Sequence, residues 1–294
     1  MTTGYFPEQA SAVGSGDYTA NVAVAVEYDQ FHVNAFLDWL DGNVPANSQG
    51  SLDGSIPDLF GGNFQSVSVG QKTSGYIADS FDFTANLETA IKFVDDSLGL
   101  VINKLKAKKI YHETLIIVCS KHGQSPIDPT LFKEVDPANL TAEIGVNTSF
   151  ITTDDIGLVF LENRADLDKA VANLEAHKTD LRIDQLIYGQ EQIDLGFGDA
   201  TKDPAVPDII VQPIKGTIYT TSKSKIAEHG GDSTDDRLVA CFAHNPKLHP
   251  QTYNGQVYTT QVAPTILKAL GLDPQKLQGV DAEGTQPLPG FGGW

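Results

Sequence analysis

The sequence predicts an α/β fold, with a mostly parallel sheet sandwiched by helices. Short apolar runs and longer amphipathic segments alternate along its 294 residues. Leu115–Cys119 is a continuous apolar run, typical of a strand that is covered on both faces. Thr84–Leu105 places on one helical stripe the residues Leu87, Ile91, Val94, Leu98, Val101, Ile102 and Leu105. The order helix, strand, polar turn recurs later in the chain, which favours an α/β protein over an all-helical or all-β one.

The first half of the chain predicts two strands and two helices. Val22–Val26 is an alternating β-branched run that predicts a strand, and Asp29–Leu40 follows with apolar residues at helical spacing. A stretch rich in glycine, serine and proline, residues 46–62, precedes the helix Thr84–Leu105. That helix leads into the strand Leu115–Cys119, and we expect it to pack on the sheet.

The second half predicts two further strands in the same sheet, Asp208–Val211 and Leu238–Phe242. Apolar spacing predicts a helix over Leu167–Leu174 and another over Thr260–Leu270, which Gly271 closes.

No period of 20 to 50 residues repeats, and no change in composition marks a linker. The sequence therefore predicts a single domain over residues 1–294, with a cap or insertion near residues 130–205.

Composition excludes two classes of partner. The net charge of −18 and the pI near 4.6 disfavour a basic face for nucleic acid or for an anionic membrane. The apolar runs are far shorter than the roughly 20 residues of a membrane span. Residues 1–10 lack the basic start and apolar run of a secretory signal, and the cellular compartment is left open.

Two cysteines occur, Cys119 and Cys241, each within a short apolar run. Such cysteines are more often buried thiols than disulfide partners or nucleophiles, so we expect both to be buried and unbonded.

A histidine followed by glycine lies beside each of two predicted strands. His122 follows Leu115–Cys119, and His229 lies in the loop before Leu238–Phe242. Ligands of α/β proteins gather past the carboxyl ends of strands, and imidazole and carboxylate groups are ligands of Zn²⁺. Spacing alone leaves two interpretations open, a metal site and a chance neighbourhood in a chain with 7 histidines and 38 acidic residues.

Several ordered motifs carry a resemblance to a known family; they are Thr114–Pro129, Pro207–Val211, Lys225–Gly231 and Thr260–Pro274. In this order they resemble microbial members of the type I phosphodiesterase / nucleotide pyrophosphatase family, within the alkaline-phosphatase superfamily. The resemblance covers nearly the whole chain from about Val22. It implies an alkaline-phosphatase-like α/β fold and metal-dependent hydrolysis of a small phosphate ester.

The resemblance also implies a two-metal centre. His122 and His229 match the family's histidine ligands of the two ions, so we expect them to lie close together. Asp79 and Asp82 occupy the loop that supplies further ligands, and a solvated acidic turn is their alternative role. We expect the two histidines with Asp79 or Asp82 to hold at most one divalent ion, which could be Zn, Mn or Ca.

Lys121 stands where the family has an aspartate ligand. A lysine can bind a substrate phosphate as a point charge, or it can form an ion pair with Asp128 or Asp235. Both roles stay open at this point.

The family begins with a strand that ends in an aspartate ligand, followed by a loop that carries the nucleophile. The chain has no room for these before Val22, so we expect the usual N-terminal third to be missing and assign no catalytic nucleophile. Two functions follow: a hydrolase of a small phosphorylated molecule, or a non-catalytic pseudoenzyme that binds a metal, carbohydrate or protein ligand. A sheet edge that lost its strand would be covered by Val22–Val26, by a helix, or by a second copy in a homodimer.

Overall fold

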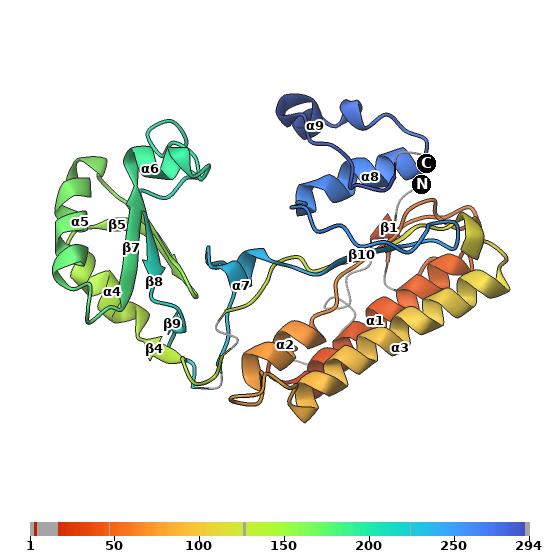
Figure 1. The fold of residues 1–294 in the computed structure, drawn as a ribbon, viewed down its shortest axis with the longest axis horizontal. Helices are drawn as coiled ribbons and strands as arrows, with labels where there is room; N and C mark the ends of the chain where they lie inside the picture. The colour runs from red at the N-terminus through yellow and green to blue at the C-terminus, as the bar shows by residue number, and fades with distance from the viewer. Residues whose placement is uncertain (1–2, 5–16, 47, 126–127, 224, 292–294) are drawn as a thin grey trace.

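The computed structural model describes residues 3–4, 17–46, 48–125, 128–223 and 225–291. Within these ranges helices and strands alternate along the chain. Figure 1 shows a larger part that contains α1, α2 and α3, and a smaller lobe that contains β5, β7 and β8. Extended chain segments connect them, so the smaller lobe stands apart from α1, α2 and α3.

Three helices pack together in the larger part: α1 (Val22–Leu40), α2 (Ser66–Thr73) and α3 (Ala85–Ala107). The predicted strand Val22–Val26 is wrong, because these residues form the first turns of α1. The side chain of Asn21 accepts the backbone N–H of Val24 and begins the helix. Burial of apolar side chains against α2 and α3 outweighs the β preference of the valines.

The helix predicted over Thr84–Leu105 is confirmed as α3, with Thr84 as its N-cap. Its predicted packing on the sheet is wrong, since α3 contacts α1 and α2 instead. Leu87 and Ala90 are fully buried on this side of the helix. An apolar stripe predicts that a helix is covered, but it does not determine whether a sheet or other helices cover it.

The strand predicted at Leu115–Cys119 is confirmed as β3 (Ile116–Cys119), and it pairs antiparallel with β10 (Cys241–His244). β10 begins three residues later than predicted, because α7 (Thr234–Arg237) ends just before Leu238. Among the described strands β3 has β10 as its one neighbour, so residues 22–26 do not supply a strand at its edge.

Antiparallel pairing dominates this structure, so the prediction of one mostly parallel sheet is wrong. β8 (Ile209–Pro213) belongs to a different sheet from β3 and β10. β4 (Lys133–Val135) and β9 (Thr217–Tyr219) form a parallel pair. An apolar run predicts a buried strand but not its partner or its direction.

The smaller lobe contains a four-stranded antiparallel sheet with the order β5 (Thr148–Thr153), β6 (Gly157–Leu161), β8, β7 (Ile183–Tyr188). Two helices pack against it, α4 (Pro137–Ile144) and α5 (Leu167–Ala176), the latter confirming the helix predicted there.

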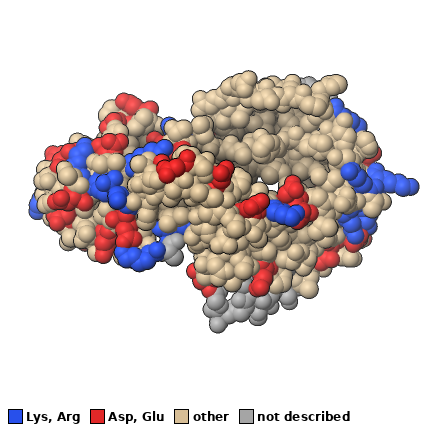
Figure 2. Space-filling model, turned by 60° about the horizontal axis from the view of Figure 1, so that its bottom comes forward, with Lys and Arg blue, Asp and Glu red and all other residues tan. Residues whose placement is uncertain are grey.

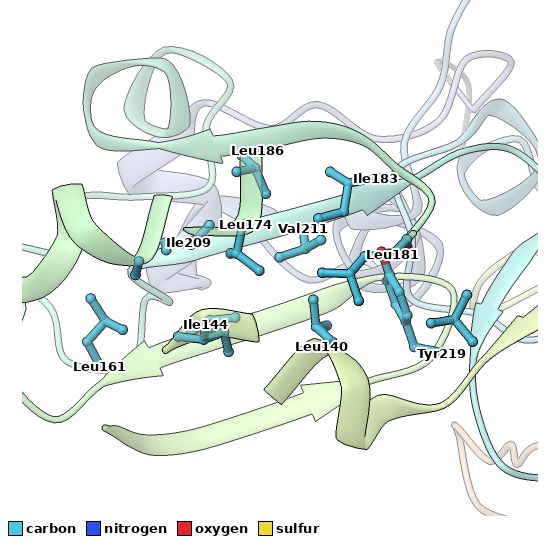
Figure 3. Close-up of a cluster of buried hydrophobic side chains, with 13 residues drawn as sticks. Leu140, Ile144, Leu161, Leu174, Leu181, Ile183, Leu186, Ile209, Val211 and Tyr219 are labelled. Atoms are coloured by element: carbon cyan, nitrogen blue, oxygen red, sulfur yellow. Dashed lines mark hydrogen bonds between the residues drawn. The ribbon is translucent and has the colours of Figure 1, made fainter. Parts of the chain in front are cut away.

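Figure 3 shows the core of this lobe, in which Leu140 and Leu174 of the helices meet Ile209 and Val211 of β8. The lobe therefore has a hydrophobic core of its own. The number of domains, and the insertion near residues 130–205, stay predictions.

The remaining helices are short: α6 (Gly189–Asp194), α8 (Val262–Ala269) and α9 (Gln278–Glu283). α8, with a 3-10 turn before it and Gly271 after it, confirms the helix predicted over Thr260–Leu270. Two short strands, β1 (Thr3–Gly4) and β2 (Gln49–Gly50), form a separate antiparallel pair. Within the described ranges no helix is both long enough and apolar enough to cross a membrane.

Both cysteines are unbonded, but neither is buried as predicted. Cys119 is exposed and Cys241 is half-buried. The reason is that β3 and β10 form a sheet of two strands, which leaves part of each strand open to solvent. The two residues lie directly opposite each other in the register of this pair.

Candidate functional site

The structure brings His122 and His229 together. Their rings stack with centroids 3.7 Å apart, although the two residues lie far apart in the sequence. Backbone bonds join the two loops: the N–H of Ser125 donates to the carbonyl of Glu228, and the N–H of Glu228 donates to the carbonyl of Ser125, both at 2.7 Å. These reciprocal bonds hold the two His-Gly motifs in one place.

Gly123 allows the second contact between the loops. Its N–H donates to the carbonyl of Asp236 at 2.7 Å, and a Cβ at this position would lie 1.9 Å from the carbonyl oxygen of Asp235. Only glycine tolerates such a close approach of two backbones. Gly123 therefore positions the adjacent His122.

The two imidazoles present nitrogen atoms that can accept a bond. Nδ1 of His122 donates to the carbonyl oxygen of Gly123 at 2.8 Å, because that oxygen can only accept. Nε2 is therefore the nitrogen of His122 that can accept a hydrogen bond. Burial lowers the pKa of His229 to about 4, and the positive charges of Lys72, His122 and Lys121 lower it in the same direction. His229 is therefore neutral near pH 7 and can accept a proton or a hydrogen bond.

A cluster of charged residues adjoins His229. Glu228 is 2% exposed, and its carboxylate contacts Nζ of Lys72 and Nζ of Lys225, each at 2.6 Å. Burial alone would raise the pKa of Glu228, but the hydrogen bonds from the two lysines outweigh burial and lower it. Burial and the nearby charge of Glu228 raise the pKa of Asp154. We call Lys72, Asp154, Lys225 and Glu228 the charged cluster.

Sequence reasoning missed Lys72 and Lys225 as site residues. Lys72 lies in the last turn of α2, and Lys225 lies inside the Lys225–Gly231 motif. Lysines at such positions are usually solvated, so their residue type alone does not distinguish them. Their contact with a buried carboxylate becomes visible only in the structure.

Lys121 is exposed, and it pairs with neither of the two expected carboxylates. Asp235 forms an ion pair with Lys215 at 2.9 Å, and Oδ1 of Asp128 accepts bonds from Thr130. The charge of Lys121 lies near enough to His229 to lower the pKa of that imidazole. The expected ion pair of Lys121 with Asp128 or Asp235 is therefore not formed, and its phosphate-binding role stays a prediction.

A cleft of about 240 Å³ opens beside His122. Its lining includes Gln71, Tyr76 and Ser120, together with the loop that precedes β10. A cleft of this volume is smaller than the roughly 300 to 1,000 Å³ of typical small-molecule sites. It has room for a phosphoryl group and its nearest substituent.

The structure does not bring Asp79 or Asp82 into this site. Both are exposed in the turn between α2 and α3, and in the described parts of the chain no three His, Cys, Asp or Glu side chains are placed to hold a metal ion. Glu228, the acid next to His229, is occupied by two lysines. The described residues therefore do not fit the predicted site of one ion held by two histidines and Asp79 or Asp82.

Figure 2 shows acidic and basic side chains intermixed over the smaller lobe. On the face shown, no broad basic surface appears. This distribution agrees with the net charge of −18 and gives no support for a nucleic-acid interface.

Comparison with proteins of known structure gives the fold. The chain is similar to human ectonucleotide pyrophosphatase / phosphodiesterase 5, with a TM-score of 0.55 and 15% identity over 83% of this chain and 59% of that chain. The murine counterpart, in an inactive form in complex with AMP, gives a TM-score of 0.54 and 16% identity over 83% of this chain and 60% of that chain. The predicted alkaline-phosphatase-like α/β class is thereby confirmed.

Curated relatives agree with this likeness. Two are named bis(5'-adenosyl)-triphosphatase ENPP4, from Pongo abelii and Homo sapiens, and each is 21% identical to this chain. The matches cover 89% of this chain and 52% of each relative, so the chain spans about half the length of the curated relatives it matches. The microbial origin that the motifs suggest stays a prediction.

The family described as type I phosphodiesterase / nucleotide pyrophosphatase matches residues 2–234, which include both His-Gly motifs and most of the described fold. This match covers well over half of the 294 residues. The resemblance carried by the motifs is therefore confirmed: the chain belongs to the type I phosphodiesterase / nucleotide pyrophosphatase family.

Proposed function

We propose that this protein hydrolyses a small phosphate ester, with the phosphoryl group bound in the cleft beside His122 and His229. One observation carries the proposal: two imidazoles stack with centroids 3.7 Å apart, and the positive charge of Lys121, which neither Asp128 nor Asp235 neutralises, acts on His229. Membership of the family supports hydrolysis of phosphate esters. The complex of the murine relative with AMP supports a nucleotide phosphate as the ligand.

Each group of the site has a chemical role in this proposal. Lys121 places a positive charge beside the phosphoryl oxygens, as lysines do in many phosphate sites. The neutral imidazole of His229 accepts a proton from a water molecule that attacks phosphorus, because its lowered pKa keeps it unprotonated near pH 7. The bond from phosphorus to the ester oxygen breaks, and the alcohol leaves with a proton from solvent. The small volume of the cleft leaves the rest of a nucleotide outside it.

No step of this mechanism uses a metal ion. His122 and His229 would give an ion two protein ligands, fewer than the three protein ligands of a catalytic zinc site. The positive charge of Lys121 opposes a divalent cation there. The binding of at most one Zn, Mn or Ca ion stays a prediction, which adding each ion to the assay tests.

The charged cluster favours a second candidate, a non-catalytic binding protein. Lys72 and Lys225 neutralise Glu228, the acid next to His229, and Lys121 replaces an aspartate that the family uses as a ligand. A site changed in this way keeps an anion-binding pocket without the donors of a two-metal centre. It would bind a phosphorylated ligand and release it unchanged.

The test uses the full chain, with AMP binding measured by calorimetry. We expect Lys121→Ala to weaken AMP binding at least about ten-fold, the loss of one charge-assisted contact. Lys202→Ala is the matched control, since Lys202 is exposed on the smaller lobe and pairs with Asp199. If Lys121→Ala binds AMP as tightly as the parent protein, the assignment of the cleft is wrong.

Turnover is measured separately with an aryl phosphodiester and an aryl phosphomonoester, with and without Zn²⁺, Mn²⁺ or Ca²⁺. We expect hydrolysis of at least one ester, lost in His229→Ala and kept in the exposed control His249→Ala. AMP binding without turnover under every condition would overturn the hydrolase proposal and favour the binding protein.

A further inference from the structure

The two cysteines of the sequence lie directly opposite each other in the β3–β10 pair. The next pair in the register, Ser120 with Ala240, is hydrogen-bonded, because the N–H of Ser120 donates to the carbonyl of Ala240 at 2.9 Å. Hydrogen-bonded and non-hydrogen-bonded pairs alternate along an antiparallel ladder. Cys119 and Cys241 therefore form a non-hydrogen-bonded pair.

This class of pair suits a disulfide. Its Cα atoms lie about 4.5 Å apart and its side chains point to the same face of the sheet, closer together than in the hydrogen-bonded class. Disulfides span Cα separations of roughly 4.4 to 6.8 Å. Burial raises the pKa of the Cys241 thiol, and the proximity of Cys119 adds to the rise, which agrees with neighbouring sulfur atoms.

We propose that Cys119 and Cys241 form an intramolecular disulfide that fastens β3 to β10 when a low-molecular-weight disulfide is present as oxidant. The exposed Cys119 thiolate attacks one sulfur of the oxidant, forms a mixed disulfide and releases one thiol. The Cys241 thiolate then attacks the sulfur of Cys119 and releases the second thiol. The two protons lost by the cysteines end on the two released thiols, so the exchange is balanced.

The position of this bond gives it a structural consequence. A two-stranded antiparallel pair is marginal by itself, and among the described strands β3 and β10 have no other neighbour. The bond would close a loop that includes the whole smaller lobe, His122 and His229. A cross-link over so long a loop restricts the unfolded chain strongly, so oxidation stabilises the base of the candidate site.

The test treats the full chain with oxidised glutathione at mildly alkaline pH. We expect its two thiols to disappear, with one cross-linked peptide pair that contains Cys119 and Cys241 found by mass spectrometry under non-reducing conditions. We also expect the melting temperature to rise by about 5 °C or more and to return on reduction.

Cys119→Ser and Cys241→Ser serve as controls, and both are expected to fold because neither site is fully buried. Each variant should show no oxidant-dependent change in melting temperature. Glutathione adducts on both cysteines of the parent protein, or a covalent dimer on a non-reducing gel, would overturn the proposal. So would a melting temperature that oxidation leaves unchanged.

Discussion

Asp155 and Asp236 are two neighbouring buried carboxyl groups, Asp155 in the turn between β5 and β6 and Asp236 in α7. Burial raises the pKa of Asp155 to about 9, and the hydrogen bond with Asp236 and its negative charge add to the rise. The N–H of Gly231 donates to Oδ1 of Asp155 at 2.9 Å, and Oγ of Ser233 donates to Oδ2 of Asp236 at 2.6 Å. Asp155 thus joins the smaller lobe to the loop of His229 through its hydrogen bond with the N–H of Gly231.

This pair predicts a pH dependence of stability. The folded protein keeps a proton on Asp155 that the unfolded chain releases above about pH 4, so the free energy of unfolding falls as pH rises from about 4 to about 9. Asp155→Asn supplies an N–H donor that does not titrate. We expect it to raise the free energy of unfolding at pH 8 by about 1 to 2 kcal/mol, measured by urea unfolding.

The pH profile of this variant should be flatter than that of the parent protein between about pH 5 and 9. Asp281→Asn is the control, because Asp281 is exposed in α9 and the substitution should leave the slope unchanged. Parallel profiles for Asp155→Asn and the parent protein would contradict the raised pKa of Asp155.

At the scale of elements, Asp29 connects α1 to α2. It is fully buried and its carboxylate accepts the backbone N–H groups of Gln65, at 2.8 and 3.0 Å, and of Ser66, at 2.8 Å. These N–H groups lie at the start of α2, where a helix has no internal acceptor for them. A carboxylate from another helix therefore caps α2, and α2 carries Lys72 into the charged cluster.

We expect Asp29→Ala to lower the free energy of unfolding by about 2 to 3 kcal/mol, since it leaves buried N–H groups without acceptors. Urea unfolding followed by circular dichroism measures the change. Glu27→Ala, an exposed position two residues earlier in the same helix, should change stability by less than about 0.5 kcal/mol. Equal effects of the two substitutions would show that the interhelical cap contributes little.

At the scale of the whole molecule, the structure contains separate hydrophobic cores. The core of the smaller lobe draws its buried residues from the segment that runs from β4 to β9, whereas a second cluster joins Val22 and Ala25 to Val69 and Ala90. No buried residue of the described chain belongs to both clusters. The two parts should therefore open independently.

Hydrogen exchange tests this independence. Leu174→Ala creates a cavity in the smaller lobe, a change that typically costs about 2 to 5 kcal/mol, and we expect faster exchange in β7 and β8 but not in α1 or α3. Leu87→Ala in α3 should give the converse pattern. Faster exchange in both parts after either substitution would show one cooperative unit.

Several elements could be predicted from local sequence, because the residues that stabilise each of them lie within the element itself. The amphipathic stripe of α3, the capped start at Thr84 and the apolar run of β3 each depend on residues within one segment. Residues 22–26 show where this fails. Their β-branched side chains favour a strand, yet the Asn21 cap and packing against α2 and α3 make them helical.

The sequence by itself determined the family and the α/β class, because these depend on ordered local motifs; the closeness of the two His-Gly motifs followed from the resemblance to the family. Only the tertiary structure decided the antiparallel pairing of β3 with β10 and the exposure of Cys119. It also decided that Lys72 and Lys225, and not Asp79 or Asp82, lie near His229. Strand partners and ion pairs join residues far apart in the chain, and their energies depend on burial and distance, which no local pattern contains.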